Sequence, residues 1–171
     1  MATNSNIMIK IAIVLIFLST AFCLSSHAQV VGGSWRGIVL LKSDKAEVEK
    51  LLGKPKGKSD IYETEKETVT VWYNKGFCKE NKKSTWNVKR DTVVGMIVSP
   101  KLSVDISKYV GGDLKNFEKN ADKEFKGTFL YLNSDESLEI ETKISNDGVE
   151  EVIYTAYRPL KSELNLRCEK R

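Results

Sequence analysis

Histidine, cysteine and proline are scarce in this chain, and each scarcity narrows the possible classes of protein. Among 171 residues there are one histidine, three cysteines and three prolines, and the eleven glycines form no glycine-rich phosphate-binding loop. Collagen-like and low-complexity proteins are therefore excluded, as are proteins that cradle a phosphate in such a loop. The remaining composition, with 41% hydrophobic and 29% charged residues, is typical of an ordinary globular protein.

The N-terminal residues predict a secretory leader. Lys10 is the only charged residue among the first 35, and it precedes an apolar stretch from Ile11 to Leu24. Two polar residues interrupt this stretch, which is also shorter than the about 20 apolar residues that a transmembrane helix needs. Small residues at Ser26 and Ala28 place the cleavage site after Ala28.

Cleavage there makes residues 1–28 a signal peptide and residues 29–171 a single exported domain. We expect this domain to be secreted or periplasmic and to have no stable transmembrane span. An alternative is that Cys23 is the acylated cysteine of a lipoprotein. Cleavage also removes His27, the only histidine. Catalytic arrangements of serine or cysteine with histidine, and metal sites with imidazole ligands, are then excluded. We accordingly expect no enzyme activity, no metal and no cofactor.

Two cysteines, Cys78 and Cys168, remain in the exported domain. In an oxidising compartment such a pair is more often a disulfide than a reactive site, so we predict that the two are bonded. Closing the 90 positions between them would stabilise the fold by on the order of 4.5 kcal/mol in the chain-entropy description. Two buried, reduced cysteines are the alternative.

Hydrophobic periodicity and turn residues predict an α+β fold. The pattern Ser43-Asp44-Lys45-Ala46-Glu47 indicates a capping box at the start of a helix that Gly53 and Pro55 end. A second helix is expected over 113–125. Strands are expected over 60–65, 68–73, 91–99, 128–132, 138–144 and 149–157, the last two joined by a turn at 146–148. This order of helices and strands predicts an antiparallel sheet with one or two packed helices. Because a helix followed by three strands occurs twice, the sequence also suggests two repeated helix-plus-three-strand units.

The segment from Trp35 to Pro55 resembles a known helix-and-meander module. Its helix ends in Leu52-Gly53-Lys54-Pro55, the Leu-Gly-x-Pro pattern of the BamE-like (SmpA/OmlA) outer-membrane assembly lipoproteins, whose module is also seen duplicated in beta-lactamase inhibitor protein. The whole exported domain, with Gly76-Phe77-Cys78 and Leu166-Arg167-Cys168, looks more like a group of uncharacterised secreted bacterial proteins. These resemblances imply an α+β fold and a role in envelope assembly or enzyme inhibition.

A basic segment around Cys78 is the first candidate binding site. Residues 75–90 hold six lysines and arginines against one acidic residue, Glu80, and include Trp86. The tentative binding residues are Trp86, Lys82, Lys83 and Arg90. Such a loop suits an anionic glycan, a lipid head group or an acidic protein surface, although many basic loops are only solvated. Nucleic acid is not favoured, because without Lys10 the chain has 26 basic against 23 acidic residues.

An acidic strand is the second candidate site. Glu139 and Glu141 fall on one face of the strand expected over 138–144, about 7 Å apart, near the separation used by inverting glycosidases. Apolar residues alternate with them, so the pair also fits the solvated face of a half-exposed strand. Trp72 alternates out of phase with its apolar neighbours and faces either a second packing layer or solvent.

From these observations we predict a non-catalytic exported module that binds a protein or a cell-envelope component. The alternatives are a carboxylate-based glycan hydrolase that uses Glu139 and Glu141, and a secreted enzyme inhibitor.

Overall fold

The computed structural model describes residues 32–57, 59–81, 83–111 and 114–168. The expected signal peptide, the lipoprotein alternative at Cys23 and the candidate binding residue Lys82 lie outside these residues. Within them, none of the helices is both long and apolar enough to cross a membrane.

The structure has the α+β fold that the sequence predicts, with strands predominating. The helical elements are α2 (Lys45–Leu52), α3 (Ile106–Tyr109) and the 3-10 helix η1 (Lys161–Leu166). A short hairpin joins β1 (Ser34–Trp35) and β2 (Ile38–Val39). The remaining strands are β3 (Ile61–Glu63), β4 (Glu67–Lys75), β5 (Arg90–Pro100), β6 (Phe117–Ala121), β7 (Thr128–Asn133), β8 (Leu138–Ile144) and β9 (Glu150–Tyr157). They form one antiparallel sheet in the order β3-β4-β5-β9-β8-β7-β6.

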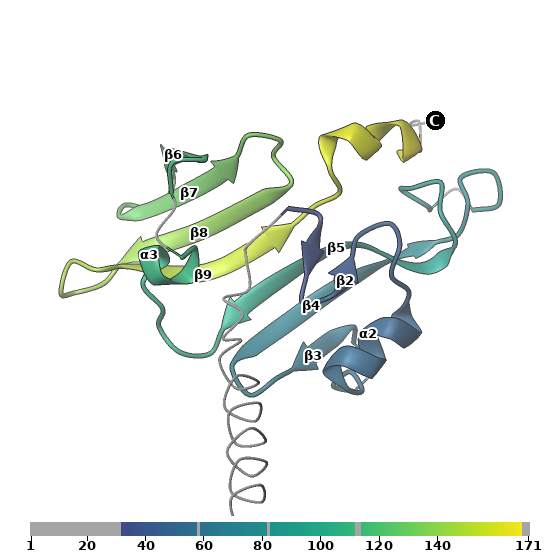
Figure 1. Ribbon diagram of the computed structural model, residues 1–171, viewed down its shortest axis with the longest axis horizontal. Coiled ribbons are helices and arrows are strands. Elements are labelled where there is room, and N and C mark those ends of the chain that lie inside the picture. The colour runs from purple at the N-terminus through teal and green to yellow at the C-terminus, as the bar shows by residue number, and fades with distance from the viewer. Residues whose placement is uncertain (1–31, 58, 82, 112–113, 169–171) are drawn as a thin grey trace, which may run out of the picture.

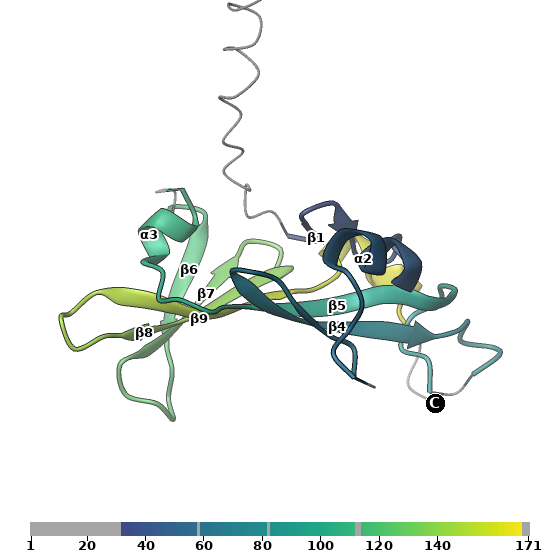
Figure 2. The ribbon, with the colours of Figure 1, turned by 90° about the horizontal axis from the view of Figure 1, so that it is seen from below.

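The helices cover only one side of this sheet. Figure 2 shows α2, α3 and β1 on the same side, with the twisted sheet beneath them. Their apolar residues pack with those of the strands into one core. The buried core residues are Trp35, Ile38, Leu40, Val48, Tyr62, Val69, Val71, Val93, Met96, Val98, Ile106, Tyr131, Leu138, Ile140, Val152 and Tyr157. The opposite side of the sheet has no covering helix among the described residues, and the candidate site lies there.

Helix α2 begins and ends as its sequence predicts. The side chain of Asp44 accepts a hydrogen bond from the backbone N–H of Glu47, and the side chain of Glu47 accepts one from the N–H of Asp44. Gly53 ends the helix with a φ of 85°, which only glycine adopts readily. The buried Val48 directs the helix onto the core.

The helix predicted over 113–125 is wrong. Phe117–Ala121 is instead the edge strand β6. It pairs with β7, with Phe117 opposite Asn133 and Ala121 opposite Phe129. The apolar residues Leu114, Phe117, Ala121 and Phe125 have helical spacing, but Ala121 and Phe125 are exposed in the structure, Phe125 to 63%, so no apolar face packs on the core. Pairing with the free edge of β7 gives hydrogen-bond partners to the backbone N–H and C=O groups of this segment. This gain outweighs the weak preference of its sequence for a helix.

The two three-stranded meanders predicted from the sequence are present. In the order β3-β4-β5-β9-β8-β7 the second meander mirrors the first, and their last strands meet at the centre of the sheet (Figure 1). Three residue pairs join them: Met96–Tyr157, Ile97–Ala156 and Val98–Thr155. The expected hairpin between β8 and β9 is also present, with Gly148 at a φ of 80°.

Candidate functional site

The register of the central strands separates a buried face from an open face. Residues directly opposite one another in a sheet point to the same side. One such row holds the core residues Val71, Met96, Tyr157 and Leu138. The adjacent row, which therefore points to the open face, holds Thr70, Ile97, Ala156 and Glu139. Trp72, opposite Gly95, belongs to this open face as well.

The indole of Trp72 lies close to the backbone of Gly95 on the open face, because Gly95 has no side chain. A Cβ atom built on Gly95 would lie 3.3 Å from Cε3 and 4.0 Å from Cζ3 of the Trp72 indole. Gly95 has no left-handed φ that would call for glycine. A glycine inside a strand weakens it, and it often marks a close approach of another group. Here that group is an indole that keeps 46% of its surface exposed. Of the two orientations left open by the sequence, Trp72 therefore takes the solvent side.

A hollow of about 470 Å³ adjoins this indole, and we call it the Trp72 hollow. Its volume is within the range of small-molecule sites. Residues of the central strands form its floor: Trp72, Val94, Gly95, Ile97, Ala156 and Tyr157. One flank comes from the loop after β4 and from the C-terminal segment: Thr85, Trp86 and Arg167. The other flank is polar: Glu139, Tyr154 and Arg158.

A buried asparagine shapes the first flank. The side-chain nitrogen of Asn74, which is 2% exposed, has two N–H donors that are shared among the carbonyl oxygens of Gly76 at 2.7 Å, Trp86 at 2.8 Å and Val88 at 2.8 Å. Its carbonyl oxygen accepts from the N–H of Trp86 at 3.4 Å. These bonds fold the loop back on itself at both ends. The sequence alone does not predict this role of Asn74, because its hydrogen-bond partners lie up to 14 positions away.

The predicted disulfide between Cys78 and Cys168 is present and completes this flank. The two Cα atoms are 5.7 Å apart, a usual separation for a disulfide. Beside it, Asn87 N–H donates to the carbonyl of Leu166 at 2.7 Å and Cys168 N–H donates to that of Thr85 at 2.9 Å. The loop and the C-terminal segment are thus joined both covalently and by backbone hydrogen bonds.

The structure separates the residues that the sequence grouped as a basic binding loop. Trp86 is only 9% exposed and lines the Trp72 hollow, so it is a wall of the site rather than a protruding anchor. Lys83 and Arg90 are exposed and do not line the hollow. Arg90 lies opposite Lys75, where β4 ends and β5 begins. Arg167 is the cation of this region that does line the hollow, and sequence spacing gave no signal for it.

The two candidate catalytic glutamates are engaged in contacts that tie β8 to β9. Glu139 accepts from the guanidinium of Arg158 at 2.8 Å and from the hydroxyl of Tyr154 at 3.3 Å. Tyr154 also lies opposite Glu141 in the register of β8 and β9. Partial burial, followed by these carboxylates, raises the pKa of Tyr154, so its hydroxyl remains protonated. Glu139 lines the hollow and Glu141 does not.

A second carboxylate, Glu150, anchors the helix side of the second meander. Its oxygens accept from Lys119 at 2.7 Å, Tyr131 at 3.0 Å and Thr142 at 2.5 Å. Partial burial alone would raise the pKa of Glu150, but these three donors outweigh it and lower the pKa. This cluster stabilises the fold and faces away from the hollow.

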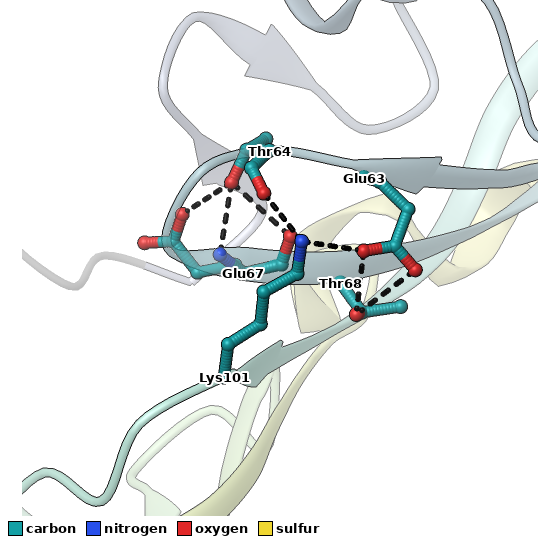
Figure 3. A network of polar contacts seen from close by, with 5 residues as sticks. All are labelled: Glu63, Thr64, Glu67, Thr68 and Lys101. Carbon is teal, nitrogen blue, oxygen red and sulfur yellow. Dashed lines mark hydrogen bonds and ion pairs between the residues drawn. The ribbon is translucent and has the colours of Figure 1, made fainter.

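A further polar network closes the turn between β3 and β4 (Figure 3). The Nζ of Lys101 contacts Glu63 at 2.6 Å and donates to the carbonyl of Thr64 at 2.6 Å. The hydroxyl of Thr64 donates to Glu67 Oε2 at 2.8 Å and accepts from the N–H of Glu67 at 2.9 Å. The hydrogen bond from Lys101 is the main reason that the pKa of Glu63 is lowered. The network joins the start of β4 to the end of β5 and has a structural role.

No group of histidine, cysteine, aspartate and glutamate within the described ranges is arranged to hold a metal ion. The groups that do converge on the open face are two indoles, a phenol and the side chains of two arginines and one glutamate. Such a set binds planar or ring-shaped ligands through stacking and hydrogen bonds.

Comparisons with known proteins identify no family for this chain. No protein-family model matches the chain, and no curated protein matches it. Among solved structures, the chain is similar to the crystal structure of a DUF4309 family protein (YjgB) from Bacillus subtilis subsp. subtilis str. 168. The sequence identity is 11% and the TM-score 0.37, and the match covers 72% of this chain and 84% of that chain. The resemblance to BamE-like lipoproteins and beta-lactamase inhibitor protein stays a prediction.

Proposed function

We propose that this chain is a non-catalytic, exported binding module that presents the open face of its sheet to a component of the cell envelope. The observation that carries the proposal is the exposed indole of Trp72 beside a hollow of about 470 Å³. Tryptophan is enriched among the residues that contribute most to binding, because its large apolar surface is desolvated at little cost in conformational entropy.

The polar flank of the hollow supports a binding role over the hydrolase alternative. Both oxygens of Glu139 are already bonded, one to Tyr154 and the other to Arg158. A glycosidase needs a second carboxyl group across the substrate. Glu141 does not line the hollow. The arrangement of the two glutamates therefore favours a structural role over a catalytic one.

Envelope binding by the exported protein tests this proposal. The full chain is expressed with its leader, the exported form is purified and its N-terminus is sequenced, with Gln29 expected first. Co-sedimentation with isolated cell envelopes should retain the unaltered protein. Trp72→Ala should reduce the retained fraction about tenfold, the loss expected of a residue central to binding.

Phe125→Ala is the matched control, because Phe125 is an exposed aromatic residue outside the hollow. It should leave retention unchanged. Equal retention of the Trp72 and Phe125 variants, or no retention of any form, would contradict the proposal. Steady turnover of a glycan that Glu139→Gln abolishes would favour the hydrolase instead.

A further inference from the structure

We infer that the Trp72 hollow binds one sugar unit of a carboxylate-bearing glycan, with Trp72 under the sugar ring and Arg167 on the carboxylate. This inference rests on the proposed function and adds the chemical class of the ligand. It starts from three properties of the hollow: a flat apolar platform, a rim that both donates and accepts hydrogen bonds, and an excess of positive charge.

The platform is the indole of Trp72, which lies on Gly95 with 46% of its surface open to solvent. One face of a pyranose ring consists of C–H groups, and these pack well against the face of an aromatic ring. Ile97 and Ala156 extend the apolar floor beside the indole. A flat ring stacked there keeps its hydroxyl groups at the edge, where the polar flank begins.

The polar flank suits hydroxyl groups, which both donate and accept. Glu139 and Arg158 form an ion pair at 2.8 Å, with the side chain of Arg158 half exposed. The carboxylate has acceptor capacity beyond its two bonds, and the guanidinium has further N–H donors. One ion pair can therefore hydrogen bond two adjacent hydroxyl groups of a sugar.

The charge of the lining points to an anion. Two arginines face one glutamate around the hollow. Arg158 is paired with Glu139, whereas Arg167 has no ion-pair partner among residues 32–57, 59–81, 83–111 and 114–168. A guanidinium fits a carboxylate with two parallel hydrogen bonds. The adjacent basic loop adds positive charge that attracts a polyanion over a longer range.

A peptide fits this place less well than a sugar. The strands under the hollow, β4, β5, β9 and β8, are all interior strands of the sheet. Each has a neighbouring strand on both sides, so a peptide lying on the floor cannot add to a free edge as a further strand. A sugar needs only the side chains that the hollow provides.

Isothermal titration of the exported protein with tetragalacturonate tests the inference, since this probe carries one carboxylate on each sugar. Its fully methyl-esterified form keeps the rings and hydroxyl groups but lacks the charge. The acid form should bind at least about tenfold more tightly than the ester, as expected for a charge-assisted contact. Arg167→Gln should abolish this difference, and Trp72→Ala should weaken binding of both forms.

Lys83→Gln is the matched control, because Lys83 lies in the basic loop beside the hollow but does not line it. It should bind the acid form within about twofold of the unaltered protein, with a change no larger than an exposed charge usually makes. Circular dichroism spectra of all variants should superimpose, so that a loss of binding can be attributed to the altered site and not to unfolding. Equal affinity for acid and ester, or an unchanged preference in Arg167→Gln, would overturn the inference.

The two proposals fail in different ways. If the exported protein is retained on envelopes through Trp72 but does not bind tetragalacturonate, the ligand class is wrong and the binding module stands. If it binds neither, both are wrong. If tetragalacturonate binds and depends on Arg167 while envelopes do not retain the protein, the ligand class stands and the envelope target is wrong.

Discussion

The indole of Trp72 lies 3.3 Å from the position that a Cβ atom on Gly95 would take, across the β4–β5 pair. The substitution Gly95→Ala therefore has two effects on stability that act in opposite directions. Alanine in place of glycine removes backbone freedom from the unfolded chain and should stabilise by about 0.5–1 kcal/mol. The new methyl group would lie 3.3 Å from the indole, which must then move by a few tenths of an ångström. We expect the unfolding free energy to change little and the Trp72 fluorescence to shift to longer wavelength.

A double-mutant cycle separates the two effects. In a Trp72→Ala background the indole is gone, so Gly95→Ala should raise the free energy of unfolding by the full amount. Urea titration of the four proteins measures the difference. The same stabilisation in both backgrounds would show that the indole does not lie on Gly95.

Asn74→Leu should destabilise the protein by about 2–3 kcal/mol. The substitution leaves the carbonyls of Gly76, Trp86 and Val88 without the amide that bonds them inside the fold. Urea titration gives the size of the loss. Asn81→Ala is the control, because Asn81 bonds Lys75 at an exposed position and should cost well under 1 kcal/mol. Similar losses in both variants would argue against a special role for Asn74.

Removal of the disulfide should cost on the order of 4.5 kcal/mol, since it releases 90 positions of chain in the unfolded state. Replacing Cys78 and Cys168 together by serine gives this loss without a free thiol. The midpoint of urea unfolding should fall for the double variant and for the reduced parent protein alike. A reducing agent should then have no further effect on the double variant.

Glu150 should make the stability of the protein depend on acid. Because the pKa of Glu150 is lower in the folded state than in the unfolded chain, its stabilisation is present above the unfolded pKa. It is lost as the pH falls through the folded value. Glu150→Gln should therefore destabilise at pH 7 by about 1–3 kcal/mol, the contribution of hydrogen bonds to a charged group. The difference from the parent protein should shrink as the pH falls below about 4.5.

Thermal unfolding between pH 3 and pH 7 checks this expectation. Glu124→Gln is the control, because Glu124 is exposed and its side chain is not part of the Glu150 cluster. Its melting temperature should follow that of the parent protein at every pH. A constant difference between Glu150→Gln and the parent protein across the range would contradict the linkage.

Local signals predicted the strands and the first helix well, because each depends on residues close in sequence. The capping residues Asp44 and Glu47 and the turn at Gly148 act within a few positions. Segment 113–125 misled the analysis, because the edge of β7 that captures Phe117–Ala121 is a tertiary partner that no local pattern encodes.

The site was predicted only in part for the same reason. The disulfide followed from compartment and cysteine count, and Trp86 does line the hollow. The platform of Trp72 depends on Gly95, and the cation that lines the flank is Arg167. Each comes from a different strand or segment, so only the assembled sheet brings them together.

The mirrored order of the two meanders gives the molecule a natural dividing line. The floor of the hollow straddles the β5–β9 pair, where three residue pairs join the halves. A polypeptide cut in the connection between β5 and α3 would carry part of the floor on each fragment, and reduction of the Cys78–Cys168 disulfide would release the two fragments from one another. Recombination of two such fragments would restore the platform and its rim at once, so ligand capture would act as a reporter of complementation.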